Sequence, residues 1–401
     1  MAAGGRALRV LVAGGGIGGL TAALALMRRG MDVQVFEQAP ALREVGAGVQ
    51  ISANGARVLD ALGLLGDVAS RSCEASGKEI RLWSTGQTWT LFDLGAESVR
   101  QYGFPYLTVY RPDLLEALAH AVQRERPGAI RLGAAVTGFT QDQAGVTLRL
   151  ADGSKAAGDV LVGADGIHSR IRHGLFGQDD PEFSVLIAWR GVIPMRSLPP
   201  HLGRPVGTNW VGPGRHVVHY PLRRGELMNF VGIVERADWR VESWTTRGSP
   251  AELAADFAGW HPDVHAIIRP IEAPYKWALM LRRPLATWTR GRVTLLGDAC
   301  HPTLPMLAQG AVQAIEDGFV LGRALAEAAD VGDALRRYEA ARHERTTKMV
   351  LGSAENAKRF HNPALAERQG AQEYVDCEWS EERVRARYDW LFRYQADTVP
   401  V

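Results

Sequence analysis

The stretch LRVLVAGGGIGG at residues 8–19 decides the fold of the chain. An aliphatic strand pattern ends at a glycine-rich turn, helix-forming residues follow as far as Arg29, and DVQVFE at residues 32–37 has the pattern of a second strand. The turn places Gly14, Gly16 and Gly19 in a GxGxxG arrangement between strand and helix, which is the context that a dinucleotide-binding turn requires. Together these features predict a βαβ unit of the Rossmann type with a right-handed crossover.

The three glycines of the turn have separate physical roles. Gly14 makes the tight turn, Gly16 lets the backbone approach a pyrophosphate, and Gly19 lets the helix pack closely on the strand. The N–H groups and the positive dipole end at the start of the helix hold the pyrophosphate. Glu37 ends the second strand, where a carboxylate is placed to accept hydrogen bonds from a ribose hydroxyl. The motif alone does not separate NAD from FAD.

Two later strand patterns also end in an aspartate beside a glycine. The strand pattern at residues 159–164 ends at Asp165-Gly166, and the pattern at residues 292–296 ends at Gly297-Asp298. Ligands of open α/β sheets bind outside the carboxyl ends of the strands. We therefore expect Asp298 to lie at the ligand and to accept hydrogen bonds from the hydroxyls of a ribityl chain.

Composition and charge exclude several classes of function. The formal net charge of +2, without a long run of like charge, argues against a nucleic acid or a membrane surface as the main partner. The three cysteines lie far apart and form no CxxC pair, so neither a disulfide framework nor a metal site is expected. The N-terminal apolar run stops at glycines, and no segment approaches the length of a membrane helix. A cytoplasmic, soluble protein is expected.

The three motifs, in this order, resemble those of the class A flavin-dependent aromatic hydroxylases, the group of para-hydroxybenzoate and salicylate hydroxylases. The resemblance covers residues 8–365. It implies FAD as the cofactor and NADH or NADPH as a transient co-substrate. It further implies that a flavin C4a-hydroperoxide formed with O2 hydroxylates a small aromatic substrate, such as a phenol or a salicylate-like hydroxy acid.

The resemblance also assigns cofactor-binding residues. It implies that the ADP half lies on Gly14, Gly16, Gly19 and Glu37, that Arg43 and Arg111 contact FAD, that Asp165 serves both FAD and NAD(P)H, and that Asp298 binds the ribityl chain. Pro112 departs from the usual motif after Arg111, although proline is tolerated in the first turn of a helix. The alternatives are surface positions for the two arginines and a turn-capping role for Asp165.

A helix is expected to begin directly after the Gly297-Asp298 motif. Gln309, Gly310 and Ala311 lead into a helical pattern that extends to about residue 329. If this helix directs its N-terminus at the flavin, its dipole and free N–H groups stabilise negative charge at flavin N1. The alternative is an ordinary junction between a loop and a helix.

Candidate catalytic residues lie in a strand pattern at residues 215–220 and beside Asp298. His216 and Tyr220 are expected on one face of the strand, and a histidine with a pKa near 6.5 is a suitable base for a phenol. His219 has the opposite parity, so we expect it to be structural. His301 is the third candidate; its alternative is a loop histidine held by backbone hydrogen bonds. The candidate substrate-binding residues are Gln50, Trp189, Pro305 and Met306.

The sequence predicts an α/β fold with a Rossmann-type FAD-binding domain, an inserted β-rich substrate domain and C-terminal helices. The predicted boundaries are residues 1–179 and 277–365 for the FAD-binding domain, 180–276 for the substrate domain and 366–401 for a C-terminal helical segment. Residues 373–394 of this segment are expected either to cover the domain or to form a dimer contact, and the protein is expected to be a monomer or a homodimer.

Several alternatives remain open at this level. The same motifs fit an FAD monooxygenase or epoxidase that acts on a larger or non-phenolic substrate, or a non-catalytic FAD-binding protein. The sequence leaves undecided the exact substrate, the position of hydroxylation, accompanying decarboxylation and the choice between NADH and NADPH. Oxidation of NAD(P)H stimulated by substrate separates an enzyme from a binding protein.

Overall fold

The computed structural model describes residues 6–42, 47–239 and 246–401. Its first sheet is the one that the glycine turn predicts. Five parallel strands have the order β18-β12-β1-β2-β8, with bounds Val293–Leu295, Val160–Gly163, Arg9–Ala13, Asp32–Phe36 and Ile130–Arg131. Aliphatic side chains fill β1 and β12 because helices and a further sheet cover this sheet, as is usual for parallel strands.

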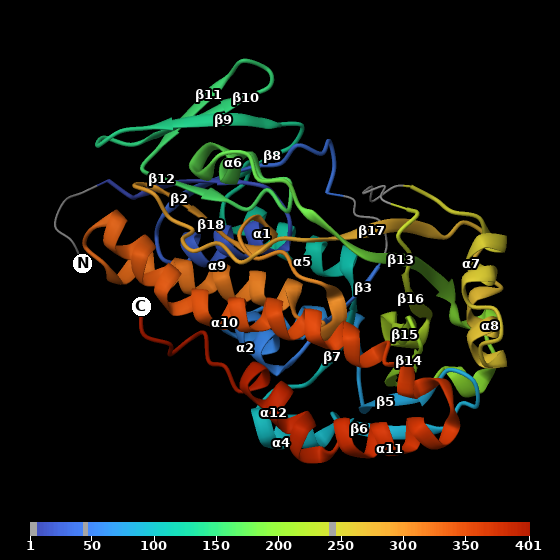
Figure 1. The fold of residues 1–401 in the computed structure, drawn as a ribbon. Coiled ribbons are helices and arrows are strands. Elements are labelled where there is room, and N and C mark those ends of the chain that lie inside the picture. The colour runs from blue at the N-terminus through green and yellow to red at the C-terminus, as the bar shows by residue number, and fades with distance from the viewer. Residues whose placement is uncertain (1–5, 43–46, 240–245) are drawn as a thin grey trace.

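Helices pack closely against the parallel sheet. α1 (Ile17–Met27) follows β1 and is buried on nearly all sides, because it lies against α5 (Arg111–Glu125) and α9 (Gly310–Glu327). The long helix α10 (Val331–Phe360) runs beside α9, as Figure 1 shows. The sequence pattern predicts helices near residues 310–329 and 334–360, and both are present as α9 and α10, with ends that differ by two or three residues.

The second large sheet has seven strands in the order β17-β13-β16-β15-β14-β5-β6. Their bounds are Tyr275–Leu281, Glu182–Pro194, Leu227–Glu235, Arg215–Leu222, Val206–Gly212, Gly77–Leu82 and Thr88–Asp93. The sheet is therefore not confined to residues 180–276, because β5 and β6 come from the N-terminal part of the chain and β17 extends to Leu281. β5 pairs with β14 in parallel, which is how the early segment joins the later strands.

The two faces of this sheet are covered differently. On one face α7 (Pro250–Asp256) and α8 (Pro262–Ile268) enclose an apolar cluster that contains Trp189 and Trp210. The sequence predicts a single helix at residues 251–259, whereas α7 ends at Asp256 and α8 follows after a break. The opposite face is directed toward the first domain and carries the candidate residues of β15.

The C-terminal segment covers part of the second sheet. α11 (Arg368–Glu378) and α12 (Glu381–Phe392) lie along β5 and β6, as Figure 1 shows. The rings of Phe92 and Tyr388 meet edge to face with 4.8 Å between their centroids, and Trp83 Nε1 donates a hydrogen bond to the Leu365 carbonyl. Of the two expectations for this segment, the structure shows the covering role.

The remaining elements complete the chain. Two three-stranded sheets consist of β11 (Lys155–Gly158), β10 (Val146–Leu150) and β9 (Val136–Gln141), and of β3 (Gly48–Ile51), β7 (Leu107–Tyr110) and β4 (Cys73–Glu74). The other helices are α2 (Ala53–Ala61), α3 (Leu65–Arg71), α4 (Ala96–Tyr102) and α6 (Arg170–Phe176). Short 3-10 turns cover Met195–Ser197, Pro200–Leu202, Arg223–Gly225, Gly297–Ala299, Pro305–Leu307 and Pro363–Ala366. Across the described ranges, no helix combines the length and the apolar character needed to cross a membrane. The predicted α/β fold class is confirmed.

Candidate active site

A cavity of about 330 Å³ lies between the two large sheets. Its volume is within the range of small-molecule sites in enzymes. The glycine turn forms one end, the start of α9 forms a side, and the exposed face of the seven-stranded sheet forms the other end. The predicted site residues that line it are Gly16, Gln50, Arg111, His216, Tyr220, Asp298, Pro305, Met306, Gln309, Gly310 and Ala311.

The glycine turn has the geometry that its motif predicts. Gly14 has a φ of +107°, and a Cβ on Gly19 would lie 2.0 Å from the Gly14 carbonyl oxygen, so neither position accepts a side chain without strain. A Cβ on Gly16, by contrast, would meet no atom within 4 Å. Gly16 lies at the cavity and precedes the first turn of α1, whose first N–H groups have no partner within the helix. This open cradle fits a pyrophosphate.

Glu37 supports the turn directly. One of its carboxylate oxygens accepts a hydrogen bond from the Gly15 N–H at 2.7 Å, and the other accepts one from the Ala39 N–H at 2.8 Å. The side chain therefore holds the end of β2 against the glycine turn. Its predicted contact with a ribose hydroxyl stays a prediction.

The two motif aspartates differ in their surroundings. Asp298 is open to the cavity, as expected for a residue that binds a ribityl chain. Asp165 instead accepts hydrogen bonds from the Ser169 hydroxyl and from the N–H groups of Arg170 and Ile171 at the start of α6. Its neighbours Ala164 and Gly166 line the cavity. Capping α6 is therefore the visible role of Asp165, and its role toward FAD and NAD(P)H stays a prediction.

The two predicted FAD-contacting arginines have different outcomes. Arg111 begins α5 and lines the cavity. Arg43 lies outside the described residues.

The N-terminus of α9 is directed at the cavity. Gln309 is the N-cap residue, and Gly310, Ala311 and Ala314 line the cavity wall. The Gln309 side chain is fixed, because its Nε2 donates a hydrogen bond to the Ser52 hydroxyl at 2.9 Å. An 18-residue helix presents its positive dipole end here, which favours negative charge on a ligand at this point.

Strand alternation places the candidate residues of the second sheet. In β15 His216, Val218 and Tyr220 line the cavity, whereas His219 is buried on the other face and accepts a hydrogen bond from Trp210 Nε1 at 3.1 Å. His219 is thus structural, as expected.

The assignment of Trp189 to the substrate pocket is wrong for this geometry. Its indole is fully buried in the apolar cluster beneath α7 and donates a hydrogen bond to Asp256. Because alternate residues of a strand point to opposite faces, its neighbour Arg190 lines the cavity instead.

His301 does not line the cavity either. Its Nε2 lies 2.6 Å from Asp317 Oδ2, its ring packs near Trp288, and the side chain is 2% exposed. Asp317 also pairs with Arg342, and although burial alone would raise the pKa of this carboxyl, the charges of His301 and Arg342 hold it at about 2. His301 is therefore part of a buried ionic network between α9 and α10, so the expected catalytic contact is not formed.

Two cations lie on the cavity face, and the sequence alone gives Lys78 no role there. Lys78 of β5 and Arg190 of β13 line the cavity, and no described residue provides either with a carboxylate partner. Burial lowers the pKa of Lys78 to about 7 and that of Arg190 to about 10. Arg190 Nε is buried without a hydrogen bond. In the strand GKEIRL at residues 77–82, alternation places Lys78 on the same face as Ile80 and Leu82. Only the fold shows that this face meets the cavity.

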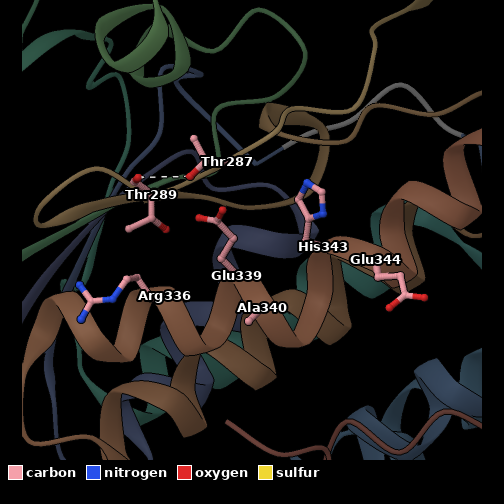
Figure 2. Close-up of a pocket in the computed structure, with 7 residues that line it drawn as sticks. All are labelled: Thr287, Thr289, Arg336, Glu339, Ala340, His343 and Glu344. Atoms are coloured by element: carbon pink, nitrogen blue, oxygen red, sulfur yellow. Dashed lines mark hydrogen bonds between the residues drawn. The ribbon is translucent and has the colours of Figure 1, made fainter.

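A second hollow lies on the surface beside α10. Figure 2 shows its residues, which are Thr287, Thr289, Arg336, Glu339, Ala340, His343 and Glu344. Both charge signs are present, and His343 Nε2 lies 2.6 Å from the Leu285 carbonyl oxygen. It contains none of the motif residues, so we assign it no role in the chemistry.

The main cavity fits an elongated dinucleotide with a flavin at one end. The open cradle at Gly16, the carboxylate of Asp298 and the helix N-terminus at Gly310 all line it. A Rossmann-type sheet with these features, joined to a second sheet that closes the far end, defines a flavin-binding enzyme.

Comparisons with known proteins agree with this class. Residues 7–353 match the family model described as "FAD binding domain". The chain is 42% identical over 356 residues, 88% of its length and 89% of the relative's, to 3-amino-4-hydroxybenzoate 2-monooxygenase PtnB3 of Streptomyces platensis. Two solved structures are similar in fold. One is an R204Q variant of HpxO from Klebsiella pneumoniae complexed with FAD, with a TM-score of 0.82, 28% identity and coverage of 96% of this chain and 98% of that chain. The other is a substrate complex of salicylate hydroxylase, with a TM-score of 0.79, 28% identity and coverage of 97% and 96%.

The chain belongs to the FAD-binding-domain family of flavin-dependent aromatic hydroxylases. It is an FAD-dependent monooxygenase that hydroxylates a small aromatic substrate.

Proposed function

We propose that the substrate is a hydroxybenzoate-type anion, held by its carboxylate and ionised at its phenol for hydroxylation. The observation that carries this proposal is that Lys78 and Arg190 line the cavity while no described residue gives either of them a carboxylate partner. A partly buried cation without an anion is costly, and the lowered pKa of Lys78 reflects that cost. A substrate carboxylate bound beside Lys78 supplies the missing anion and removes this cost. The names of two relatives, 3-amino-4-hydroxybenzoate monooxygenase and salicylate hydroxylase, contain substrates of this class.

Lys78 is the residue that we assign to the carboxylate. Its ammonium lies 4.9 Å from the centre of the Tyr106 ring, which holds the side chain in place without neutralising it. Gly207 of β14 is in register with Lys78, and a Cβ there would lie 3.4 Å from Lys78 Cγ, so the missing side chain leaves room for the lysine stem. Arg190 lies three strands further along the sheet from β14 and adds positive potential without occupying the same position.

His216 is the residue that we assign to the phenol. Its ring lies at the cavity, with the side chain of Phe360 packed at 5.0 Å between ring centroids. Burial, and then the neighbouring His361, lower the pKa of His216 well below the usual value, so the imidazole is neutral and able to accept a proton. Tyr220 has a raised pKa because it is buried, and its hydroxyl is therefore a hydrogen-bond donor for the substrate oxygen.

FAD, when bound and reduced, supplies the activated oxygen that is added to the ring. Gly16, Arg111, Asp298 and the N-terminus of α9 are the groups placed to hold it. The wall of the cavity on the sheet side is apolar at Val218, Val231, Ile233 and Leu279. These side chains exclude water, which strengthens the electrostatic interactions within the site and limits side reactions.

A matched panel of ligands tests the substrate class. Purified holoenzyme is assayed for NADH and NADPH oxidation and for product with hydroxybenzoates, the corresponding phenols without the carboxylate, and the corresponding methyl esters. We expect efficient, product-forming oxidation with one or more free acids and a kcat/KM at least tenfold lower for the ester and phenol. Equal or better turnover of the uncharged compounds would contradict the proposal.

A further inference from the structure

A hydrogen-bonded chain connects the cavity with the protein surface. His216 Nδ1 lies 2.7 Å from Nε2 of His361, which follows the last residue of α10. His361 Nδ1 lies 2.8 Å from Oε1 of Glu235, at the end of β16. His216 is 1% exposed, the His361 side chain is 2% exposed, and the Glu235 side chain is 53% exposed. The chain therefore starts in the buried site and ends in water.

The chemistry of the three groups fixes the direction of each hydrogen bond when both histidines are neutral. A carboxylate only accepts, so His361 donates from Nδ1 to Glu235 and keeps a lone pair on Nε2. His216 must then donate from Nδ1 to His361, which leaves the lone pair of His216 on Nε2. Glu235 thus determines, through His361, which nitrogen of His216 is basic.

We propose that His216, His361 and Glu235 form a proton path that carries the phenolic proton of the substrate to solvent. The substrate O–H bond breaks as His216 Nε2 takes the proton, and the Nδ1 proton of His216 passes to His361 Nε2. The Nδ1 proton of His361 passes to Glu235, whose carboxyl releases it to water. The reverse transfer returns one proton to the departing product and restores both tautomers.

The buried position of His216 makes an onward path necessary. An imidazole in this environment is a poor final acceptor, because burial and the neighbouring His361 disfavour its cation. When the proton transfers at His216 and His361 are coupled, the two adjacent rings are never cationic at the same time. His361 pairs with Glu235, which keeps the pKa of that carboxyl below its usual value and leaves it ionised and ready to accept. The inference rests on the proposed function for the identity of the proton donor, but the tautomers do not depend on any substrate.

The first experiment tests the tautomers without a substrate. Nitrogen-15 NMR of histidine-labelled holoenzyme is recorded at neutral pH, with His216→Gln and His361→Gln used to assign the two rings. We expect the His216 ring to be neutral with its proton on Nδ1. A proton on Nε2 of His216 in the substrate-free enzyme would overturn the proposal, whatever the substrate class is.

The second experiment follows the proton itself. Oxidised holoenzyme is mixed with 3-amino-4-hydroxybenzoate in weak buffer with a pH indicator, while flavin absorbance reports binding. Glu235→Gln keeps an acceptor for His361 but cannot take a proton, and Glu182→Gln, an exposed residue on β13 of the same sheet, is the matched control. We expect release of the proton to be about 10- to 100-fold slower in Glu235→Gln, with unchanged binding and with the control like the wild type.

A third variant separates proton transfer from structural support. His361→Ala is expected to release the proton as slowly as Glu235→Gln, and added imidazole is expected to restore the rate at least about tenfold by replacing the lost ring. Release at the wild-type rate in both variants would overturn the proposed path. Absence of any flavin response to the probe would count against the proposed substrate, while the NMR result would still decide for or against the path.

Discussion

At the scale of single residues, two glycines of the same turn are required for different reasons, Gly16 for binding FAD and Gly19 for folding. Because a Cβ on Gly16 meets no protein atom within 4 Å, Gly16→Ala is expected to leave the melting temperature of the apoprotein unchanged. The added methyl group occupies the cradle, so the affinity for FAD is expected to fall at least about tenfold. Gly19→Ala is the contrasting variant, because its Cβ would lie 2.0 Å from the Gly14 oxygen and the apoprotein itself should be destabilised. Fluorescence titration with FAD and thermal melts measure the two effects, and unaltered FAD affinity of Gly16→Ala would contradict this placement of the cofactor.

The Lys78 side chain gives a prediction about substrate recognition. Lys78→Met keeps most of the side-chain volume and removes the charge, so KM for the hydroxybenzoate should rise about 10- to 100-fold, the effect of losing one hydrogen bond to a charged group. Lys155→Met changes an exposed lysine of β11 and should have no effect. Steady-state kinetics at saturating NADH or NADPH measure the change. An unchanged KM with unchanged FAD content would remove Lys78 from the substrate site.

The same residue predicts a dependence on pH. The pKa of Lys78 in the free enzyme is lowered to about 7, so the side chain is cationic below that pH and loses its charge as pH rises through it. Binding of a carboxylate requires the cation, so kcat/KM is expected to fall as pH rises above about 7 in the wild type. In Lys78→Met this fall should be absent. A decline of the same size in both proteins would assign it to another group.

At the scale of elements, the pairing of α9 with α10 depends on buried charges. Arg342 on α10 contacts Glu316 at 2.6 Å and Asp317 at 2.8 Å on α9, and all three side chains are fully buried. Arg342→Met leaves two buried carboxylates without this cation, which should lower the free energy of unfolding by about 3–5 kcal/mol. Arg336→Met, on the exposed side of the same helix, should change it by less than about 0.5 kcal/mol. Urea unfolding of both variants at a fixed FAD concentration tests this, and equal midpoints would show that the network is not essential.

The elements also show what the sequence could predict. The βαβ unit and the ends of β12 and β18 follow from local patterns, because strand, turn and helix are adjacent in the chain. The contribution of β5 to the seven-stranded sheet does not, because its partner β14 lies more than a hundred residues later. For the same reason the sequence does not indicate Lys78 or His361, since each reaches the site only through long-range packing. Trp189 and His301 were misplaced because proximity along the chain does not specify the direction of a side chain.

At the scale of the whole molecule, the cofactor joins the two sheets. The cavity is lined by the glycine turn, by the start of α9 and by the seven-stranded sheet, so a ligand there contacts parts of the chain that are distant in sequence. A ligand that binds only the folded state stabilises that state by about 2.7 kcal/mol when the ligand concentration is a hundred times Kd. Removal of FAD should therefore lower the melting temperature by several degrees, and re-addition should restore it. Calorimetry of apo- and holoprotein tests this, and Gly16→Ala, with its weaker binding, should show a smaller shift at equal FAD concentration.

The most direct test of the central claim is incorporation of oxygen from labelled O2. Holoenzyme is incubated with NADH or NADPH, ¹⁸O2 and 3-amino-4-hydroxybenzoate, with salicylate and other hydroxybenzoates in parallel, and the products are identified by mass spectrometry. We expect at least one hydroxybenzoate to gain a single ¹⁸O atom on its ring, with NAD(P)H consumed in proportion. Oxidation of NAD(P)H without any labelled aromatic product, across the whole set of hydroxybenzoates, would contradict it.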